Sequence, residues 1–207
     1  TPVETFATLR GGFGLPNVAL LEFDAVTETL VGTPGASNVF ASGAQVQDVA
    51  VQVARLLAAA GGPEIAVAAR HAFAAVADQL ALGSPVDRAD QITIEAIIQA
   101  AATRAAVNLD GDLAAAVAHV IADGNAYIDG LDPSGGLTFL EEVGRAQHVF
   151  QSVVADDIAA AATGALPLAE LVAGNTGDGL AARVLGEQRQ PFIPPALTVS
   201  DLVLSDE

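Results

Sequence analysis

The stretch SNVFASGAQVQDVAVQVARLLAAA, residues 37–60, decides the fold expected for this chain. Its apolar residues recur near intervals of three and four, which is the spacing that places side chains on one face of an α-helix. We therefore expect a long amphipathic helix that ends at Gly61-Gly62. The polar residues of the stretch fall largely elsewhere and should face solvent: Gln45, Gln47, Asp48, Gln52 and Arg55.

Further segments with helical periodicity follow this one. Pro63 stands at the start of the next helix, which should pair with 37–60 as an antiparallel hairpin. Ser84 and Thr138 precede two later apolar periodic segments and are expected to be helix N-caps, because their hydroxyl oxygens can accept from the free backbone N–H groups of a first helical turn. The chain should therefore be mostly helical.

Glycine-containing pairs predict where helices stop. We expect a short first helix to end at Gly11-Gly12 and another helix to break at Gly124-Asn125. The fold class predicted from these patterns is all-α, a multi-helix bundle with orthogonal and antiparallel packing. One helical domain should span residues 1–186.

The end of the chain has a different pattern. Residues 187–195, EQRQPFIPP, contain three prolines and predict an extended linker. Residues 196–207, ALTVSDLVLSDE, then alternate apolar and polar positions as a half-buried β-strand does. A single strand has no partner of its own kind in a helical domain, so we expect it to join a sheet of a neighbouring β domain or subunit. Its apolar positions are Leu197, Val199, Leu202 and Leu204.

Charge limits the classes of partner. The net charge is −17, with 25 acidic and eight basic residues, and a negative field of this size argues against binding nucleic acid or inserting into a membrane with anionic lipid. The longest apolar stretches are interrupted by Pro, Gly and acidic residues, so no transmembrane helix is expected. Since Met is absent, the chain is expected to start inside a longer precursor or after processing.

Two carboxylate clusters are candidate calcium ligands. Asp110 and Asp112 alternate with Gly111 as at the start of a calcium-binding loop, and Asp129 and Asp132 flank a glycine-rich turn. The first cluster lacks the later ligands of a full EF-hand loop. Helix capping by Asp110 or Asp112, and turn formation by Asp129 and Asp132, are the competing interpretations.

Histidines and catalytic motifs suggest little chemistry. His71, His119 and His148 each lie in a separate predicted helix, without the spacing that assembles a metal site. They remain the contacts expected if the bundle holds a haem, a pigment or a lipid between its helices. No nucleophile motif or phosphate loop is present, so we expect a non-enzymatic protein without a resident cofactor.

Several short motifs near the start carry a family resemblance. They are Thr1-Pro2, Gly14-Leu15-Pro16, Leu21 to Asp24, and 44–49 with the sequence AQVQDV. The chain resembles helical modules of very large, acidic, repetitive surface and secreted proteins of Gram-negative bacteria, where such modules adjoin Calx-beta, cadherin-like or RTX calcium-binding regions. The resemblance covers about the first 60 residues. It implies an extracellular or cell-surface location in a bacterium.

Together these patterns favour a structural or adhesion module. We expect a subunit of an extracellular surface, matrix or filament protein that assembles through residues 196–207, with a homo-polymer as one form of assembly. The alternative is the helical bundle that binds a haem, pigment or lipid.

Overall fold

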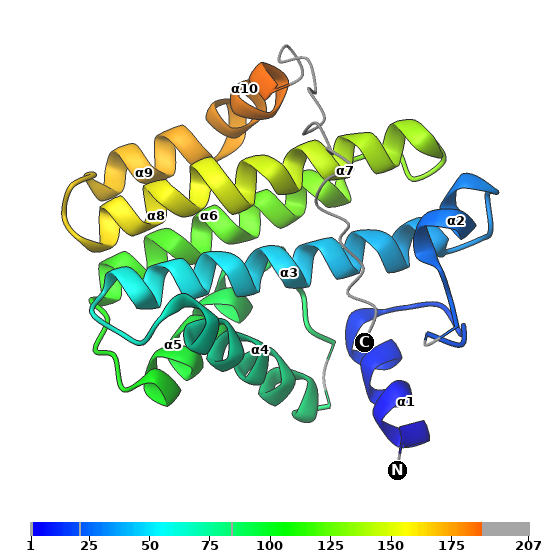
Figure 1. Ribbon diagram of the computed structural model, residues 1–207, viewed down its shortest axis with the longest axis horizontal. Coiled ribbons are helices and arrows are strands. Elements are labelled where there is room, and N and C mark those ends of the chain that lie inside the picture. Colours follow the sequence, from blue (N-terminus) through cyan, green and yellow to red (C-terminus); the bar gives the residue numbers. More distant parts are fainter. Residues whose placement is uncertain (1, 21, 84, 188–207) are drawn as a thin grey trace, which may run out of the picture.

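The computed structural model describes residues 2–20, 22–83 and 85–187, and of residues 2–6 only the backbone (Figure 1). Regular structure within these ranges is entirely helical, which confirms the predicted all-α class and the helical bundle. The prediction of a linker and a strand concerns residues that, beyond Glu187, lie outside the described part of the chain.

The described elements are numbered in chain order. They are α1 (Pro2–Phe13), α2 (Ala25–Leu30), α3 (Ala36–Ala59), α4 (Ile65–Ala81), α5 (Gln91–Ala105), α6 (Gly111–Asp129), α7 (Leu137–Val149), the π-helix η1 (Phe150–Val154), α8 (Ala155–Ala162), α9 (Leu168–Asn175) and α10 (Gly177–Glu187).

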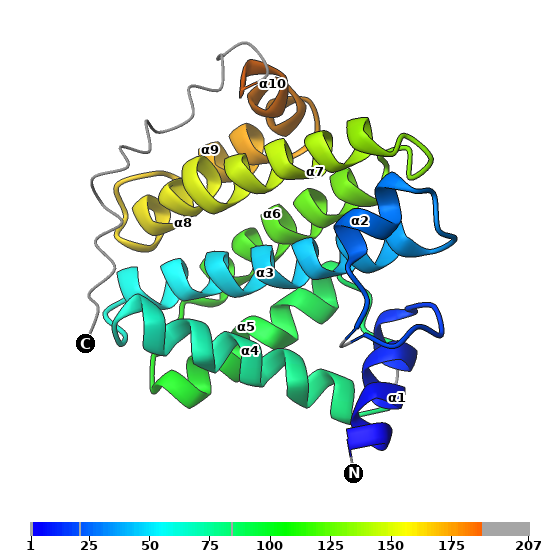
Figure 2. The ribbon, with the colours of Figure 1, turned by 45° about the vertical axis from the view of Figure 1, so that its right-hand side comes forward.

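Helix α3 lies in the middle of the molecule. It packs against α2 and α4 to α8, including η1. In both ribbon views α4 and α5 lie on one side of α3, while α6 and the continuous α7–η1–α8 segment lie on the other (Figures 1 and 2). The predicted long helix at 37–60 is therefore present, and most of the bundle is built around it.

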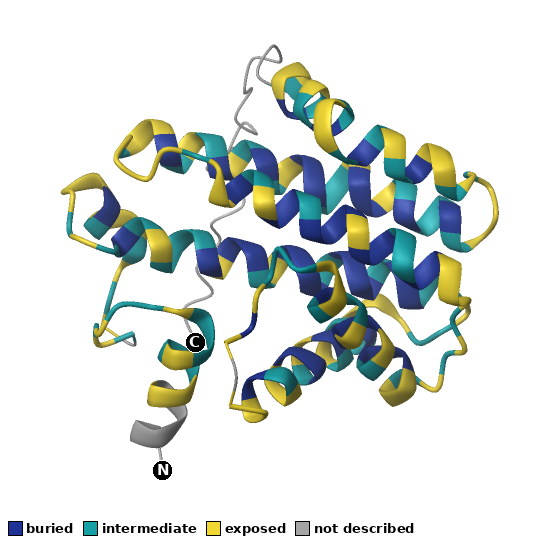
Figure 3. Cartoon of the chain, turned by 180° about the vertical axis from the view of Figure 1, so that it is seen from behind, coloured by how far each residue is buried: buried dark blue, intermediate teal, exposed yellow. Residues whose placement is uncertain are grey.

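Alanine allows the helices of this bundle to approach closely. Fully buried alanines lie on every helix of the α3–α6 group, and Val, Ile and Leu fill the space between them. Viewed from behind, buried residues follow the facing sides of the helices and exposed residues follow their outer sides (Figure 3). Phe150 is buried at 1% exposure and packs against Tyr127 edge-to-face with ring centroids 6.4 Å apart.

Local signals at several helix ends agree with the structure. At the end of α3, Gly61 adopts a φ of 85°, and the Gly62 N–H donates to the Leu57 carbonyl at 2.9 Å. This is the backbone pattern in which a left-handed residue satisfies the last carbonyls of a helix. Asp24 caps α2 and Asp110 caps α6, in each case by accepting from two backbone N–H groups.

The predicted stop at Gly11-Gly12 is wrong, because α1 continues to Phe13. Tertiary packing accounts for the glycine: a Cβ at Gly12 would overlap the end of the Leu80 side chain on α4, so a larger residue would force Leu80 to shift where the two helices meet. The loop before α5 also pairs with this point, since the Val86 N–H donates to the Gly12 carbonyl at 2.7 Å.

The predicted break at Gly124-Asn125 is also wrong, because α6 runs unbroken from Gly111 to Asp129. Both residues are buried inside the bundle, where packing outweighs the low helix propensity of glycine. Two predicted caps differ as well. The residue that caps α5 is Asp90 and not Ser84, and α7 begins after Gly136 and not after Thr138.

The continuity of α6 leads to a stability prediction. Gly124→Ala should raise the free energy of unfolding by about 0.5–1 kcal/mol, because alanine restricts the unfolded chain and favours the helix. Its Cβ would make ordinary contact with the Phe150 ring at 3.5 Å. Chemical denaturation measures the change.

Two further glycines serve as controls. Gly144→Ala, on the exposed side of α7 with nothing within 4 Å, should give the propensity gain alone. Gly62→Ala should destabilise, since its Cβ would lie 2.5 Å from the Leu57 carbonyl oxygen. A loss of stability in Gly124→Ala would contradict the packing described for α6.

Candidate functional site

The most unusual feature of the interior is a polar stripe on α3, formed by Gln45, Asp48 and Gln52. Their exposed fractions are 0%, 1% and 2%. The prediction that these three residues face solvent is therefore wrong. Spacings of three and four residues place them on one face of α3. That face is covered because α3 has helices on both sides, so the stripe must find partners inside the protein.

Gln45 joins three parts of the chain through its side-chain amide. Its Nε2 donates to the Asn125 carbonyl at 3.0 Å and to Asp129 Oδ1 at 2.7 Å, both on α6. Its Oε1 accepts from Arg88 Nε at 2.7 Å. Since Arg88 lies in the loop between α4 and α5, this one amide connects α3, α6 and that loop.

Arg88 is held at its position by several neighbours. Its Nη2 donates to Ser42 Oγ at 3.1 Å, its carbonyl accepts from Asn125 Nδ2 at 2.7 Å, and its guanidinium carbon lies 5.1 Å from the centre of the Phe13 ring. Burial lowers the pKa of Arg88, and the charges of Asp129 and Asp87 oppose that shift. The Nη1 atom is buried and has no hydrogen-bond partner among the described residues.

Asp48 is a buried carboxyl group at the centre of the stripe. Its Oδ1 accepts from Gln151 Nε2 at 2.7 Å, whereas Oδ2 has no partner within the described ranges. Burial raises its pKa to about 7, although the amides of Gln151 and Gln147 act in the opposite direction. The Oε1 atom of Gln52, one helical turn further along α3, is also buried without a donor.

Gln151 reaches Asp48 from the π-helix η1. Such a segment has hydrogen bonds from residue i to i+5, and single-turn π-bulges within α-helices occur frequently at functional sites. Here η1 interrupts the otherwise α-helical segment from Leu137 to Ala162. It presents Phe150 and Gln151 to the interior of the bundle, where one packs against Tyr127 and the other binds the carboxyl group of Asp48.

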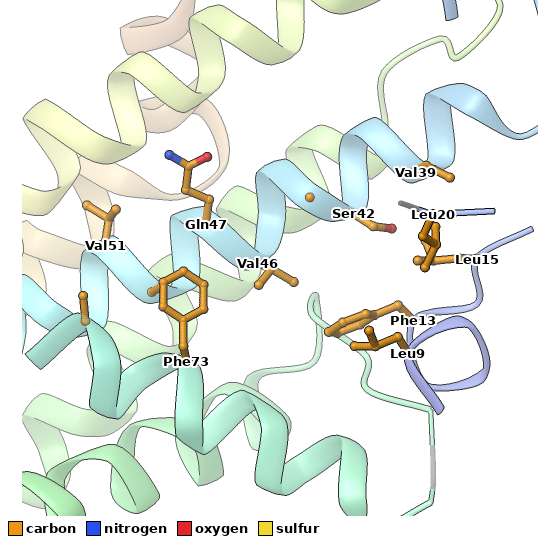
Figure 4. A pocket seen from close by; sticks show the side chains of 13 residues that line it. Leu9, Phe13, Leu15, Leu20, Val39, Ser42, Val46, Gln47, Val51 and Phe73 are labelled. Atoms are coloured by element: carbon orange, nitrogen blue, oxygen red, sulfur yellow. The ribbon is translucent and has the colours of Figure 1, made fainter. Parts of the chain in front are cut away.

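An apolar pocket lies beside the polar stripe, between α1, α3 and α4, and we call it the α1–α3–α4 pocket. Its volume is about 600 Å³. In Figure 4 Phe13 and Leu9 approach it from α1, Phe73 from α4, and Val46 from α3. Ser42 belongs both to this lining and to the hydrogen-bond network, because its hydroxyl oxygen accepts from Arg88. The full lining is Leu9, Phe13, Leu15, Leu20, Val39, Ser42, Gly43, Val46, Gln47, Ala50, Val51, Ala69 and Phe73.

The two predicted carboxylate clusters lie at opposite ends of α6. Asp110 caps the start of the helix, with Asp112 in its first turn. Asp129 is the last residue of α6 and accepts from Gln45, while Asp132 accepts from the backbone N–H and the hydroxyl of Ser134. At 1.5 Å per residue, the two ends of this helix are about 27 Å apart. The described residues hold no group of three or more His, Asp or Glu side chains suited to a metal ion.

The histidines lie on three different helices and outside the lining of the pocket. His119 and His148 are exposed, and His71 is partly buried on α4. His148 Nε2 lies 3.4 Å from Glu187 Oε1. None of the three belongs to the residues that line the pocket.

The sequence patterns did not identify the residues of the stripe and the pocket as a candidate site. A recurrent set of polar residues at 45, 48 and 52 has the same periodicity as a core face, and that was the available signal. Arg88 carries no such signal, because it lies in a loop between two helices.

Comparison with known proteins adds no functional information. The chain matches no protein-family model, no curated protein and no solved structure. In the part of the chain that the structure describes, none of the helices has the length and hydrophobicity required to cross a membrane.

The buried carboxyl group predicts a pH dependence of stability. The pKa of Asp48 is about 7 in the folded protein, whereas the ordinary pKa of an aspartate side chain is 3.8. Between these two pH values the folded protein keeps a proton that the unfolded chain loses. The contribution of Asp48 to stability is therefore full below about pH 4 and falls as the pH rises to about 7, by on the order of 4 kcal/mol. Asp48→Asn should remove this component and be more stable than the wild type at pH 8.

Urea unfolding of both proteins between pH 4 and pH 8 measures the difference. Asp112→Asn, which removes an exposed carboxylate at the start of α6, is the matched control. Its free energy of unfolding should change with pH as that of the wild type does. If the free energy of unfolding of Asp48→Asn showed the same pH dependence as the wild type, Asp48 would not be the group that retains the proton.

Proposed function

We propose that this chain is a non-enzymatic helical module of an extracellular bacterial surface, matrix or filament protein, and that it assembles through its C-terminal segment. The observation that supports this best is the use of the polar stripe. Gln45 ties α3 to α6 and to the loop before α5, and Asp48 ties α3 to η1, all in the interior. Such internal hydrogen bonds stabilise one arrangement of the helices, as a rigid spacer module requires.

Two further observations are consistent with this role. The net charge of −17 keeps the module soluble and attracts divalent cations, so calcium is the ion we propose for its surroundings. The core extends as far as Val184 near the end of α10. Residues 196–207 would then act as an interaction strand for a neighbouring β domain or for a second subunit, and repeated exchange between subunits would give a homo-polymer.

Deletion of residues 191–207 tests the assembly proposal. The helical body should keep its far-ultraviolet circular dichroism and its melting temperature, because its described core lies within residues 36–184. Assembly, measured by analytical ultracentrifugation and electron microscopy, should be lost. Val199→Asp should weaken assembly as the deletion does, whereas Thr198→Asp, at the alternate position of the predicted strand, should not. Polymerisation unchanged by the deletion would overturn the proposal.

The α1–α3–α4 pocket favours a second function, the binding of an apolar ligand. A volume of about 600 Å³ lies within the range of roughly 300–1,000 Å³ that is typical of small-molecule sites, and the lining is almost entirely apolar. Because no histidine lines the pocket, we propose a lipid-like ligand and not a haem.

A neutral apolar dye such as Nile red tests whether the pocket is a binding site. Its fluorescence should increase with the wild type and much less with Gly43→Leu, because a leucine there would project into the pocket from α3. A Cβ at Gly43 has nothing within 4 Å, so folding should be preserved. Gly144→Leu, an equally open helical position on α7, should behave as the wild type does. Equal fluorescence in all three proteins would exclude this pocket as the dye site.

A further inference from the structure

We propose that the α1–α3–α4 pocket binds a long-chain carboxylate, with its alkyl chain among Phe13, Val46 and Phe73 and its carboxylate on the hydroxyl group of Ser42. This inference rests on the second function proposed above and adds the chemical class of the ligand. It depends on one side chain shared by the apolar pocket and the buried network.

Ser42 is the polar group that the buried part of the pocket offers to a ligand. Its exposed fraction is only 6%, and its Oγ accepts from Arg88 Nη2 at 3.1 Å. A hydroxyl group that accepts through oxygen still has its own proton to donate. Among the described residues, that proton has no acceptor. A ligand atom beside Ser42 should therefore be a hydrogen-bond acceptor.

The positive charge of Arg88, which donates to Ser42, favours an anionic acceptor on the ligand. An oxygen that accepts from Ser42 Oγ at about 2.7 Å would lie within about 6 Å of Arg88 Nη2. The Arg88 guanidinium forms no ion pair within 4 Å in the described part of the chain. The charges of Asp129 and Asp87 act on it without a direct hydrogen bond, and Gln45 bonds to both Arg88 and Asp129. The positive charge is therefore only partly balanced at this end of the pocket.

Other charges around the pocket agree with this polarity. Although the chain has 25 acidic residues, the residues that line the pocket in the described part of the chain include no Asp or Glu. Arg10 lies one turn before Phe13 on α1 and donates to Asn17 Oδ1 at 2.6 Å in the adjoining loop. Arg10 thus joins α1 to the loop that supplies Leu15 and Leu20 to the pocket lining. Charge complementarity favours a fatty-acid-like anion over a neutral or cationic amphiphile.

Three amphiphiles with the same alkyl chain test the class of ligand. Isothermal titration calorimetry of the full chain at pH 8 and low salt, below the micelle concentration, should give at least tenfold tighter binding of dodecanoate than of dodecanol. Dodecyltrimethylammonium should bind most weakly. Comparable affinity for dodecanoate and dodecanol would overturn the carboxylate assignment while leaving an apolar pocket in place. No binding of any of the three would overturn both proposals.

Variants locate the site and the source of the preference. Gly43→Leu should abolish dodecanoate binding, and Gly144→Leu should leave it unchanged. Ser42→Ala and Arg88→Gln should each reduce the preference for dodecanoate over dodecanol to less than threefold, with dodecanol affinity retained. Circular dichroism verifies that each variant folds. If Arg88→Gln does not fold, Ser42→Ala and the wild-type affinities for the three amphiphiles still test the carboxylate preference.

The pocket has one other occupant to exclude, the C-terminal segment of a neighbouring copy. If the segment fills the pocket, the wild type should not bind dodecanoate and Gly43→Leu should reduce assembly in the ultracentrifuge. That combination would overturn the proposal. Unchanged assembly of Gly43→Leu, together with loss of dodecanoate binding, supports it.

Discussion

The enclosure of α3 is the constraint on which the rest of the structure depends. Because α3 has neighbours on both sides, its polar residues Gln45, Asp48 and Gln52 are buried, and a buried polar group without a partner is costly. Gln45 meets this requirement by bonding to α6 and to the loop before α5, and Asp48 by bonding to η1. The positions of these surrounding elements are therefore coupled to single side chains on one central helix.

Periodicity in the sequence predicted the helical class and the long central helix, because both depend on local spacing. It could not predict which faces of α3 are covered, since that depends in part on Asn125 and Gln151, which lie 80 residues after Gln45 and 103 residues after Asp48. Gln45, Asp48 and Gln52 were placed in solvent for that reason. Glycine was misleading in the same way. Gly12 and Gly124 interrupt nothing, because one permits a close helix contact and the other is buried against Phe150.

The candidate site was equally beyond local reasoning. Carboxylates and histidines attract attention in a sequence, yet Asp110 serves as a cap, and the three histidines lie apart from the pocket. The pocket instead combines apolar residues of α1, α3 and α4 with Ser42, a residue with no motif around it. Its chemical character comes from Arg88, which a turn of the chain between α4 and α5 places behind Ser42.

The π-helix η1 has a consequence for the length of the chain. Its wider winding accommodates one residue more than a continuous α-helix would hold between the same two ends. The extra residue lies between Phe150 and Val154, and α7 and α8 therefore both keep their buried faces toward the core. Removal of one residue within this turn would leave Val143 and Ile158 facing the core, whereas the same deletion in α7 or α8 would rotate one helix by about 100°.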